Sequence, residues 1–312
     1  MPQTAHAVLM IRPAHFGSNP ETAPSNAFQH LEALPDRIAH RAALQEFDRV
    51  VAALRDAGIE VCVADDEPEI PRPDAIFPNN WFSTHDDGTV VLYPMHAPSR
   101  RAEVRRDLIE TLATRHGFRI DRILDLTPHA DAGFALEGTG SMVLDREQRV
   151  AYACLSARTH RVVLDEFCAA LGYDACVFSA LDRSGVPIYH TNVQMWIGTQ
   201  VAAVCLDAIA DAGERRAVRE RLGRGGRTVL DLSHDQVAAF AGNALELLGS
   251  DGHPVVAMSA QASAALDPAQ RAAITAYARI ADTDIATIER CSGGSVRCML
   301  AEIFLPRDVA AE

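Results

Sequence analysis

Short β-branched runs alternate with amphipathic helical stretches along the whole chain, and this alternation limits the fold more than any other feature. Helical spacing of apolar residues predicts helices at His40–Ala57, Ser99–His116, Thr159–Leu171, Ala212–Leu222 and Pro268–Ile280. Nine short apolar runs predict strands at Ala7–Ile11, Glu60–Val63, Val90–Tyr93, Met142–Leu144, Val150–Leu155, Ala202–Leu206, Thr228–Asp231, Val255–Met258 and Met299–Leu305. Nine strands for five helices exceed the one strand per helix of a strict βαβ repeat.

Two predicted helix starts carry capping signals. Asp267 is followed by Pro268, the combination of an N-cap residue and a proline at the first helical position. Ser99 is the expected N-cap of the helix that runs to His116.

No glycine-rich phosphate-binding loop follows the first predicted strand. Ile11 leads into residues 12–18, which contain no GxGxxG pattern, so a nucleotide-binding Rossmann domain is not expected. Residues 12–36 contain four prolines and predict a long irregular loop, either a lid over a site or a plain surface excursion. Because no repeat or flexible linker is evident, we expect one domain over residues 1–312.

The charge of the chain disfavours several classes of partner. Forty-two acidic against 29 basic residues give a net charge of −13, which repels nucleic acid and anionic membrane surfaces. No stretch approaches the roughly 18 apolar residues of a membrane span, and the first ten residues do not form a secretory signal. Seven cysteines without CxxC spacing argue against a disulfide framework and a zinc knuckle. We therefore expect a cytoplasmic protein that needs no metal and no cofactor.

Four polar clusters interrupt this pattern, each in a turn near a predicted strand, at residues 73–85, 136–141, 189–196 and 291–300. The first cluster places Asn79 and Asn80 beside large aromatic residues, although asparagine is depleted in strands. Buried amides need hydrogen-bond partners, which either a ligand or a turn can supply. Each cluster taken alone is therefore compatible with an ordinary turn.

Three of the clusters carry the groups of a nucleophilic site. Cys298 follows a Gly-Gly pair that permits close backbone approach, His190 precedes an apolar strand, and Glu137 begins a glycine turn. A thiol, an imidazole and a carboxylate are the parts of a Cys-His-Glu site. The spacing leaves open whether the three side chains converge.

In their order along the chain, these motifs resemble the guanidine-modifying superfamily, which includes arginine deiminase, dimethylarginine dimethylaminohydrolase and the amidinotransferases. The motifs are Pro-Asp-Ala-Ile-Phe-Pro-Asn-Asn (73–80), Ala-Pro-Ser-Arg-Arg-Ala-Glu-Val (97–104), Leu-Glu-Gly (136–138), Leu-Ser-Ala-Arg-Thr (155–159), His190 and Gly-Gly…Cys-Met (293–299). The resemblance is greatest to the citrulline-utilisation branch. It implies an α/β fold, a five-bladed propeller (pentein) of ββαβ units with pseudo-fivefold symmetry and an active site on the axis.

The resemblance also implies roles for single residues. Cys298 matches the nucleophile, His190 the acid and base, and Glu137 the carboxylate that holds the imidazole. A cationic His190 would then stabilise the thiolate.

At the other end of the substrate, Asp74 matches the ligand of an α-ammonium group. Arg100 and Arg158 match two ligands of an α-carboxylate, for which the planar guanidinium is well suited. The expected partner is therefore a small amino acid, with a homodimer as a possible assembly.

Two departures from the family pattern bear on the substrate. Guanidine-specific relatives usually have aspartate where Asn80 stands, and arginine deiminases have His-x-Asp where this chain has His190-Thr191-Asn192. A guanidinium is a cation with donors only, whereas a neutral ureido group offers both an acceptor and donors, as an amide does. Asn80 and Asn192 therefore favour citrulline, and whether Asn79 or Asn80 faces the ligand stays open.

The predicted reaction converts citrulline into ornithine, carbon dioxide and ammonia through an S-carbamoyl intermediate on Cys298. The alternatives within the superfamily are a hydrolase that deiminates arginine or methylarginine, and an amidinotransferase. An alternative of another class is a non-catalytic propeller that binds a macromolecule. The presence of the thiol, the imidazole and the carboxylate argues against this alternative.

Overall fold

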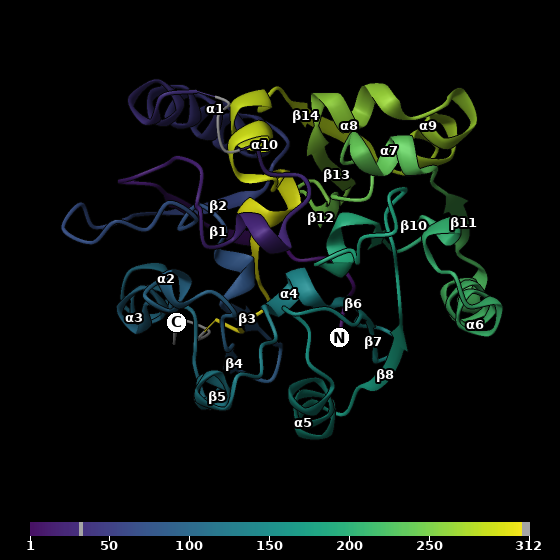
Figure 1. Cartoon of the computed structure of the whole chain (residues 1–312), viewed down its shortest axis with the longest axis horizontal. Helices are drawn as coiled ribbons and strands as arrows, with labels where there is room; N and C mark the ends of the chain where they lie inside the picture. Colours follow the sequence, from purple (N-terminus) through teal and green to yellow (C-terminus); the bar gives the residue numbers. More distant parts are fainter. Residues whose placement is uncertain (31–33, 308–312) are drawn as a thin grey trace.

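The computed structural model describes residues 1–30 and 34–307, and its strands form five sheets of three strands each. Figure 1 looks along the shortest axis and shows the sheets arranged as blades around a centre. In every blade the middle strand runs antiparallel to one neighbour and parallel to the other. The predicted five-bladed α/β propeller is confirmed.

Four blades are continuous in sequence, and the fifth is closed by the end of the chain. The continuous blades are β3 (Phe82–Thr84), β4 (Thr89–Leu92) and β5 (Arg122–Asp125); β6 (Val143–Asp145), β7 (Val150–Cys154) and β8 (Asp174–Phe178); β9 (Met195–Ile197), β10 (Val201–Val204) and β11 (Thr228–Asp231); and β12 (Leu245–Leu248), β13 (Pro254–Ser259) and β14 (Arg279–Thr283). In the remaining blade β15 (Ala301–Ile303) pairs with β1 (Ala7–Arg12), which pairs with β2 (Glu60–Asp65). The register of β15 against β1 therefore closes the ring, with Ala7 opposite Ile303.

A helix crosses over between the second and third strand of each blade, because parallel strands need such a connection. These crossover helices lie on the outside of the ring in Figure 1. They are α1 (Asp36–Asp56), α2 (Pro98–Arg101) with α3 (Arg106–His116), α5 (Arg161–Leu171), α6 (Ala212–Leu222), and α8 (Ala260–Ala265) with α9 (Pro268–Thr275). Shorter helices α4 (Gly138–Ser141), α7 (His234–Ala238) and α10 (Ala286–Ser292) lie in the turns and connections between blades.

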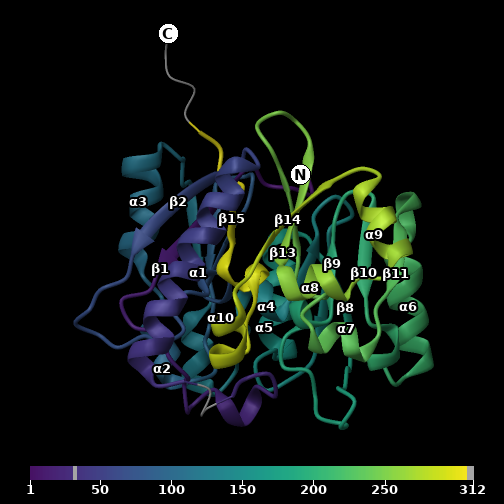
Figure 2. The ribbon, with the colours of Figure 1, turned by 90° about the horizontal axis from the view of Figure 1, so that it is seen from above.

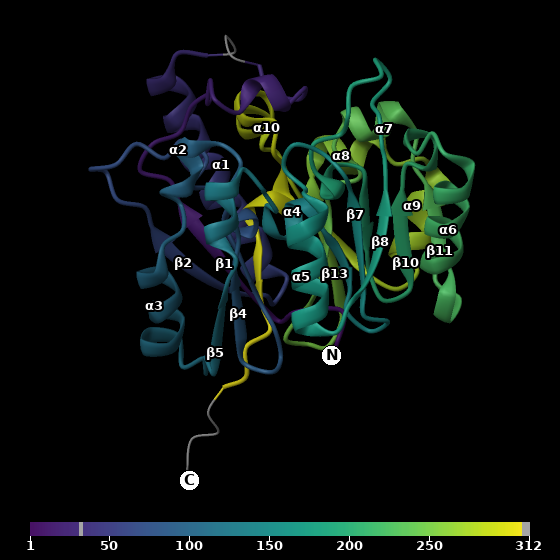
Figure 3. The same cartoon turned by 60° about the horizontal axis from the view of Figure 1, so that its bottom comes forward.

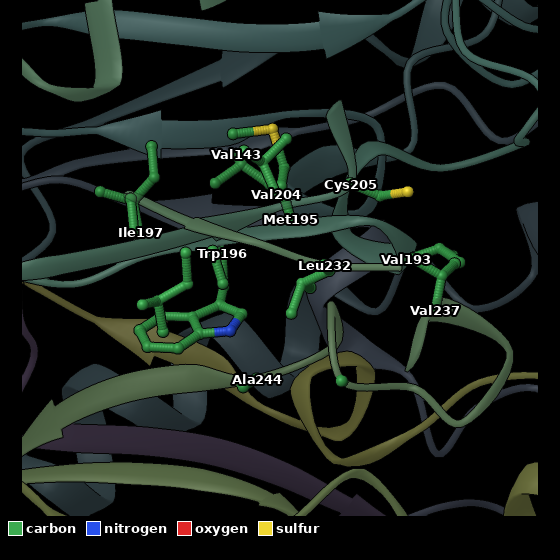
Figure 4. Close-up of a cluster of buried hydrophobic side chains, with 14 of the residues drawn as sticks. Val143, Val193, Met195, Trp196, Ile197, Val204, Cys205, Leu232, Val237 and Ala244 are labelled. Carbon is green, nitrogen blue, oxygen red and sulfur yellow. The ribbon is translucent and has the colours of Figure 1, made fainter. Parts of the chain in front are cut away.

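Apolar side chains fill the space between the blades and their helices in four buried clusters. Figure 4 shows part of the largest one, where Met195 and Trp196 of β9 lie near Val204 of β10 and Leu232. Full burial of such a side chain contributes about 1.5–3 kcal/mol, so these contacts hold each blade to the next. Among the described residues, no helix is both long enough and apolar enough to cross a bilayer.

Several predicted boundaries are wrong. The predicted helix Ser99–His116 is two helices, and its N-cap is Ala97 rather than Ser99. The chain turns between α2 and α3, where the buried Arg100 side chain bonds to Glu103. The helix predicted to start at His40 is α1, which begins at Asp36.

The predicted helix from Pro268 ends at Thr275, and β14 occupies part of the remainder. The capping box of Asp267 with Gln270 confirms the predicted start of that helix. The last strand is also shorter than predicted, because Met299 belongs to a turn of 3-10 helix. The strands that sequence patterns missed altogether are β3, β5, β8, β9, β12 and β14, most of which are short or half-exposed.

Candidate active site

The candidate site lies where the turns before the inner strands meet at the centre of the ring. Short turns of 3-10 helix at Pro78–Asn80, Thr191–Val193 and Val296–Met299 precede β3, β9 and β15. Helix α4 precedes β6, lies near the centre in Figure 1, and contacts the first two of these turns. The four turns come from distant parts of the sequence, and together they carry the predicted reactive groups.

His190 and Glu137 form a buried pair at this centre. His190 Nε2 and Glu137 Oε2 lie 2.8 Å apart, and the other carboxylate oxygen accepts the backbone N–H of His96 at 3.0 Å. Burial lowers the pKa of His190 to about 4, although the hydrogen bond to Glu137 acts in the opposite direction. Burial alone would raise the pKa of Glu137, but Arg158, His190 and Arg100 bring it well below its usual range. At neutral pH the pair is therefore a neutral imidazole beside a carboxylate.

Cys298 is buried at the end of the last turn, and its closest polar neighbours are amides. Asn192 Nδ2 lies 3.6 Å from the Cys298 Sγ, and Asn243 Nδ2 lies 3.3 Å from it. Asn243 also donates to the backbone oxygen of Asn192 at 2.9 Å, which fixes the two amides relative to each other. Because burial lowers the pKa of His190 to about 4, the ring does not supply the positive charge that was expected near the thiol, and the hydrogen-bond partners of Sγ are these amides.

Asn243 was not identified from the sequence, although its distance from the next strand resembles that of Asn192 and Cys298. Counting back three residues from the first residue of β9 or β15 gives Asn192 or Cys298. The same count from β12 gives Gly242, the neighbour of Asn243. A Cβ at Gly242 would lie 2.3 Å from the backbone oxygen of Val193, so only glycine lets this turn approach.

Of the two adjacent asparagines, Asn80 faces the cavity. Its Oδ1 accepts from Arg100 Nη1 at 3.1 Å, whereas its Nδ2 is buried without a protein partner. Asn79 is fully buried and does not line the cavity. A Cβ at Gly140 would lie 2.4 Å from Asn80 Nδ2 and 2.8 Å from His190 Nδ1, so glycine lets the amide and the imidazole approach α4.

The three residues predicted to clamp an amino-acid head group lie together on one side of the cavity. Arg100 is held by Glu103, with Nη2 2.8 Å from Oε2, and its Nε lies 3.7 Å from Asp74 Oδ2. Burial acts to lower the pKa of Arg100, but Glu103, Asp74 and Glu137 raise it, so it stays a cation. Arg158 Nη1 lies 3.6 Å from Glu137 Oε2, the oxygen that Arg100 Nη1 approaches at 3.5 Å.

Part of the irregular segment 12–36 covers this side of the site, while its residues 31–33 lie outside the described residues. Asn19 Nδ2 donates to Asp74 Oδ2 at 2.7 Å, and Arg158 donates to Ser25 Oγ at 2.7 Å and to the Thr22 oxygen at 3.0 Å. Figure 3 shows the first part of the chain, in purple, passing over the end of the ring near α10. The segment therefore occupies hydrogen-bonding positions that the predicted clamp residues offer.

The cavity beneath this segment is small, with about 20 Å³ open to water. That volume holds a water molecule but not an amino acid. Its lining combines the predicted groups with the covering segment: Thr22, Asn26, Asp74, Phe77, Asn80, Arg100, Arg158, Tyr189, His190, Ser292, Gly294 and Cys298. An amino acid would therefore need space that residues of the covering segment now occupy.

A larger cavity of about 450 Å³ lies beside Phe28, whose ring contacts Tyr189 of the smaller one. It contains none of the predicted site residues. The candidate active site is the smaller cavity, because the thiol, the imidazole and the head-group residues all line it.

Comparisons with known proteins show the family of the chain and its fold. The sequence profile of the eukaryotic N,N-dimethylarginine dimethylhydrolase family matches residues 12–305. The chain belongs to this family. It is thus a cysteine-dependent hydrolase of the guanidino-modifying kind, within the pentein superfamily. No curated protein matches its sequence.

Solved structures of low sequence identity share the fold of this dimethylhydrolase family member. ArgZ, an arginine dihydrolase from the ornithine–ammonia cycle in cyanobacteria, has a TM-score of 0.74 at 16% identity, covering 96% of this chain and 41% of that chain. The N-terminal domain of ArgZ bound to substrate has a TM-score of 0.72 at 17% identity, covering 96% of this chain and 99% of that chain. A dimethylarginine dimethylaminohydrolase adduct with 4-chloro-2-hydroxymethylpyridine has a TM-score of 0.64 at 13% identity, with the same coverage. The chain thus spans about 41% of the full-length ArgZ chain.

The predicted superfamily is therefore confirmed, while the narrower placement in the citrulline-utilisation branch stays a prediction. The family and the two kinds of neighbour have names that refer to arginine or methylarginine. These matches support the predicted alternative, a guanidino substrate, better than they support citrulline.

Proposed function

We propose that Cys298 is the nucleophile of this hydrolase, with His190 as its acid and base and Glu137 as the residue that orients the imidazole. The neutral ring of His190 takes the thiol proton, and the Cys298 sulfur attacks the terminal carbon of the substrate. His190 then returns the proton to the nitrogen that leaves as ammonia. The imidazole next removes a proton from water, which attacks the thioester-like intermediate and releases the sulfur.

The terminal group that this site fits best is a ureido group, as in citrulline. One observation supports this choice: Asn80, which lines the cavity together with Cys298, has a buried donor at Nδ2, and Asn192, whose Nδ2 lies 3.6 Å from the sulfur, has a buried acceptor at Oδ1, each without a protein partner. A ureido group presents an oxygen to the first and an N–H to the second. A guanidinium presents only N–H groups, so it would leave Asn80 Nδ2 unpaired, at a cost of about 1–3 kcal/mol.

With citrulline the steps balance as a single hydrolysis. Attack and loss of ammonia leave an N-alkyl S-carbamoyl group on Cys298, and water converts it into a carbamate of ornithine. The carbamate decomposes into ornithine and carbon dioxide. One water is consumed, and the thiol is regenerated.

The second candidate is a guanidino substrate, arginine or a methylated arginine. The family name and the names of the structural neighbours favour it. The acidic groups near the cavity also suit a cation, because Asp74 and Glu137 oppose Arg100 and Arg158, and Glu103 adds a third carboxyl group, whose pKa burial raises to about 7. These groups lie on the head-group side, whereas the described hydrogen-bond partners of the Cys298 Sγ are amides alone.

At the other end we propose that Asp74 binds the α-ammonium group and that Arg100 and Arg158 bind the α-carboxylate. Binding requires segment 19–26 to withdraw, because Asn19, Thr22 and Ser25 hold two of these side chains. An amino-acid head group offers equivalent donors and acceptors in their place. We also propose that residues 1–312 work as one catalytic domain.

A substrate comparison tests the proposal. The purified chain is incubated with citrulline, arginine, methylarginine, dimethylarginine and succinylarginine, and products are identified by mass spectrometry. We expect conversion of citrulline into ornithine with one ammonia released. Consumption of arginine or dimethylarginine while citrulline is ignored would replace the first candidate by the second. No turnover of any of them would contradict both candidates.

A further inference from the structure

A second cluster of metal-binding side chains lies away from the active site, between two blades. Glu60 and Cys62 are two residues apart on β2, so their side chains lie on the same face of the strand. His116 is the last residue of α3, which belongs to the next blade. Figures 2 and 3 both show α3 beside β2. One ligand atom from each of the three residues lies within 4.8 Å of the other two.

Two of these three ligand atoms are not engaged elsewhere. In the part of the chain that the structure describes, neither the Cys62 thiol nor the His116 ring forms a hydrogen bond with the protein. Glu60 Oε1 accepts from Arg307 at 2.5 Å, which leaves its second oxygen available. A thiol, a ring nitrogen and a carboxylate oxygen therefore face one another with unused capacity.

The position of the cluster also suits an ion that arrives from solvent. Cys62 is buried, His116 is half-buried and Glu60 is exposed. The ion therefore has a route past Glu60 and His116, while Cys62 forms the closed end of the site.

We propose that Glu60, Cys62 and His116 bind a zinc-like divalent cation, with water in the fourth position. Sulfur, imidazole and carboxylate are together the ligands that Zn²⁺ accepts, at about 2.0–2.3 Å, in tetrahedral geometry. Three ligands around such an ion lie roughly 3.3–3.8 Å apart, so small side-chain rotations from the present positions are enough. Mg²⁺ and Ca²⁺ prefer oxygen ligands and are not expected to bind.

The bound ion would add a link between two blades that already meet through apolar contacts and through the ion pairs of Arg105 with Asp66 and Glu67. Cys62 already packs in the same buried cluster as Leu108 and Leu112 of α3. A ligand that binds only the folded chain raises its melting temperature. We therefore expect Zn²⁺ to stabilise the protein without taking part in turnover.

The test uses the full chain with Cys298→Ser, because the Cys298 thiol is itself a soft metal ligand. The metal-free protein is titrated with Co²⁺ and, separately, with Zn²⁺. We expect one Co²⁺ per chain, with visible bands of a four-coordinate ion and a thiolate charge-transfer band in the near ultraviolet. Zn²⁺ should displace the Co²⁺ and raise the melting temperature, whereas Mg²⁺ should do neither.

The variants Cys62→Ala and His116→Gln are then introduced separately in the same background. Loss of a residue that only supports a metal ligand weakens metal binding by roughly 10–100-fold. Loss of a ligand itself, in either variant, should weaken Co²⁺ binding by at least as much. Cys62→Ala should also abolish the charge-transfer band, while Cys176→Ser, a buried cysteine of another blade, should leave it unchanged.

Absence of Co²⁺ binding in the Cys298→Ser chain would overturn the proposal. So would a charge-transfer band that survives Cys62→Ala. Should Cys62→Ala fail to fold, the half-exposed His116→Gln variant still decides, because unchanged affinity in it contradicts the assignment.

Discussion

The two sides of the active-site cavity are built from different chemistry. On the head-group side, Asp74, Arg100 and Arg158 are charged, and each already has a charged or polar partner. On the amide side, Asn80 lines the cavity and accepts from Arg100, and the Nδ2 of Asn192 lies 3.6 Å from the sulfur. Both amides are neutral, and each keeps one buried atom without a partner. Buried polar atoms without partners are costly, so the second arrangement points to a missing ligand more strongly than the first.

This difference indicates how the two sides contribute to binding. The head-group side exchanges contacts with segment 19–26 for contacts with the substrate, so the balance between the two sets of contacts determines how tightly any substrate binds. The amide side is fixed by the turns of three blades, and a ligand there gains hydrogen bonds without losing others. We therefore expect the amide side to set specificity and the charged side to set affinity.

The largest effect is expected from Cys298→Ser, which removes the sulfur where the two sides meet. Turnover should fall by roughly 10⁴-fold or more, as when other hydrolases lose their nucleophile. Substrate should still bind, measured by calorimetry, because both sides remain. Cys291→Ser is the control, since Cys291 is buried in α10 and does not line the cavity. Equal loss in both variants would contradict the assigned nucleophile.

A smaller but more selective effect is expected from adding acid to the amide side. The double variant Asn80→Asp with Asn192→Asp should increase the preference for arginine over citrulline, as the ratio of kcat/KM values, by roughly 100-fold. The reason is that two carboxylates accept from a guanidinium and neutralise it. Asn79→Asp buries a charge at a residue that neither lines the cavity nor bonds to the Cys298 sulfur, and it serves as the matched control. An equal ratio in the two variants would refute the role of the amides.

On the charged side, Arg158→Lys should raise KM about tenfold with a smaller change in kcat. The guanidinium of Arg158 lies 4.7 Å from the centre of the Tyr189 ring, and a lysine can neither stack in this way nor bind a carboxylate through two N–H groups. Steady-state kinetics measure both constants, and Arg161→Lys is the control, because Arg161 is exposed and pairs with Asp165. A fall in kcat alone would place Arg158 with the reacting groups instead.

The smallest expected effect is the pH dependence of stability that His190 causes. It tests whether His190 is neutral, like the amide side, or charged. Its pKa of about 4 in the fold lies below that of an exposed histidine, so the unfolded chain binds a proton that the fold excludes. The contribution of His190 to stability is therefore complete above about pH 6.5 and decreases as the pH falls towards 4, by up to about 1.4 kcal/mol per pH unit.

Urea unfolding at several pH values measures this dependence. His190→Gln should reduce the acid slope, while the exposed His253→Gln should leave it unchanged. A slope will remain in both, because burial also lowers the pKa of His85, to about 3. An unchanged slope in His190→Gln would mean that His190 is charged in the fold and belongs to the charged side.

Much of the fold was predictable because crossover helices and middle strands have strong apolar patterns. The inner strands β3 and β9 have three residues each, too few for a periodic pattern, and β14 was mistaken for the end of a helix. Within the site, Cys298, His190 and Glu137 were found from their residue types. Asn243 was missed because a Gly-Asn turn before a strand is common, and only its position beside the sulfur distinguishes it.

By itself the sequence determined the alternation of strands and helices, the acidic surface, and the presence of a thiol, an imidazole and a carboxylate in separate turns. Only the tertiary structure decided which of these meet, because the ring brings together turns that lie far apart in the chain. It also decided their charges, since burial keeps His190 neutral although Glu137 is 2.8 Å away. Proximity and desolvation depend on the whole fold, and no local stretch of residues encodes them.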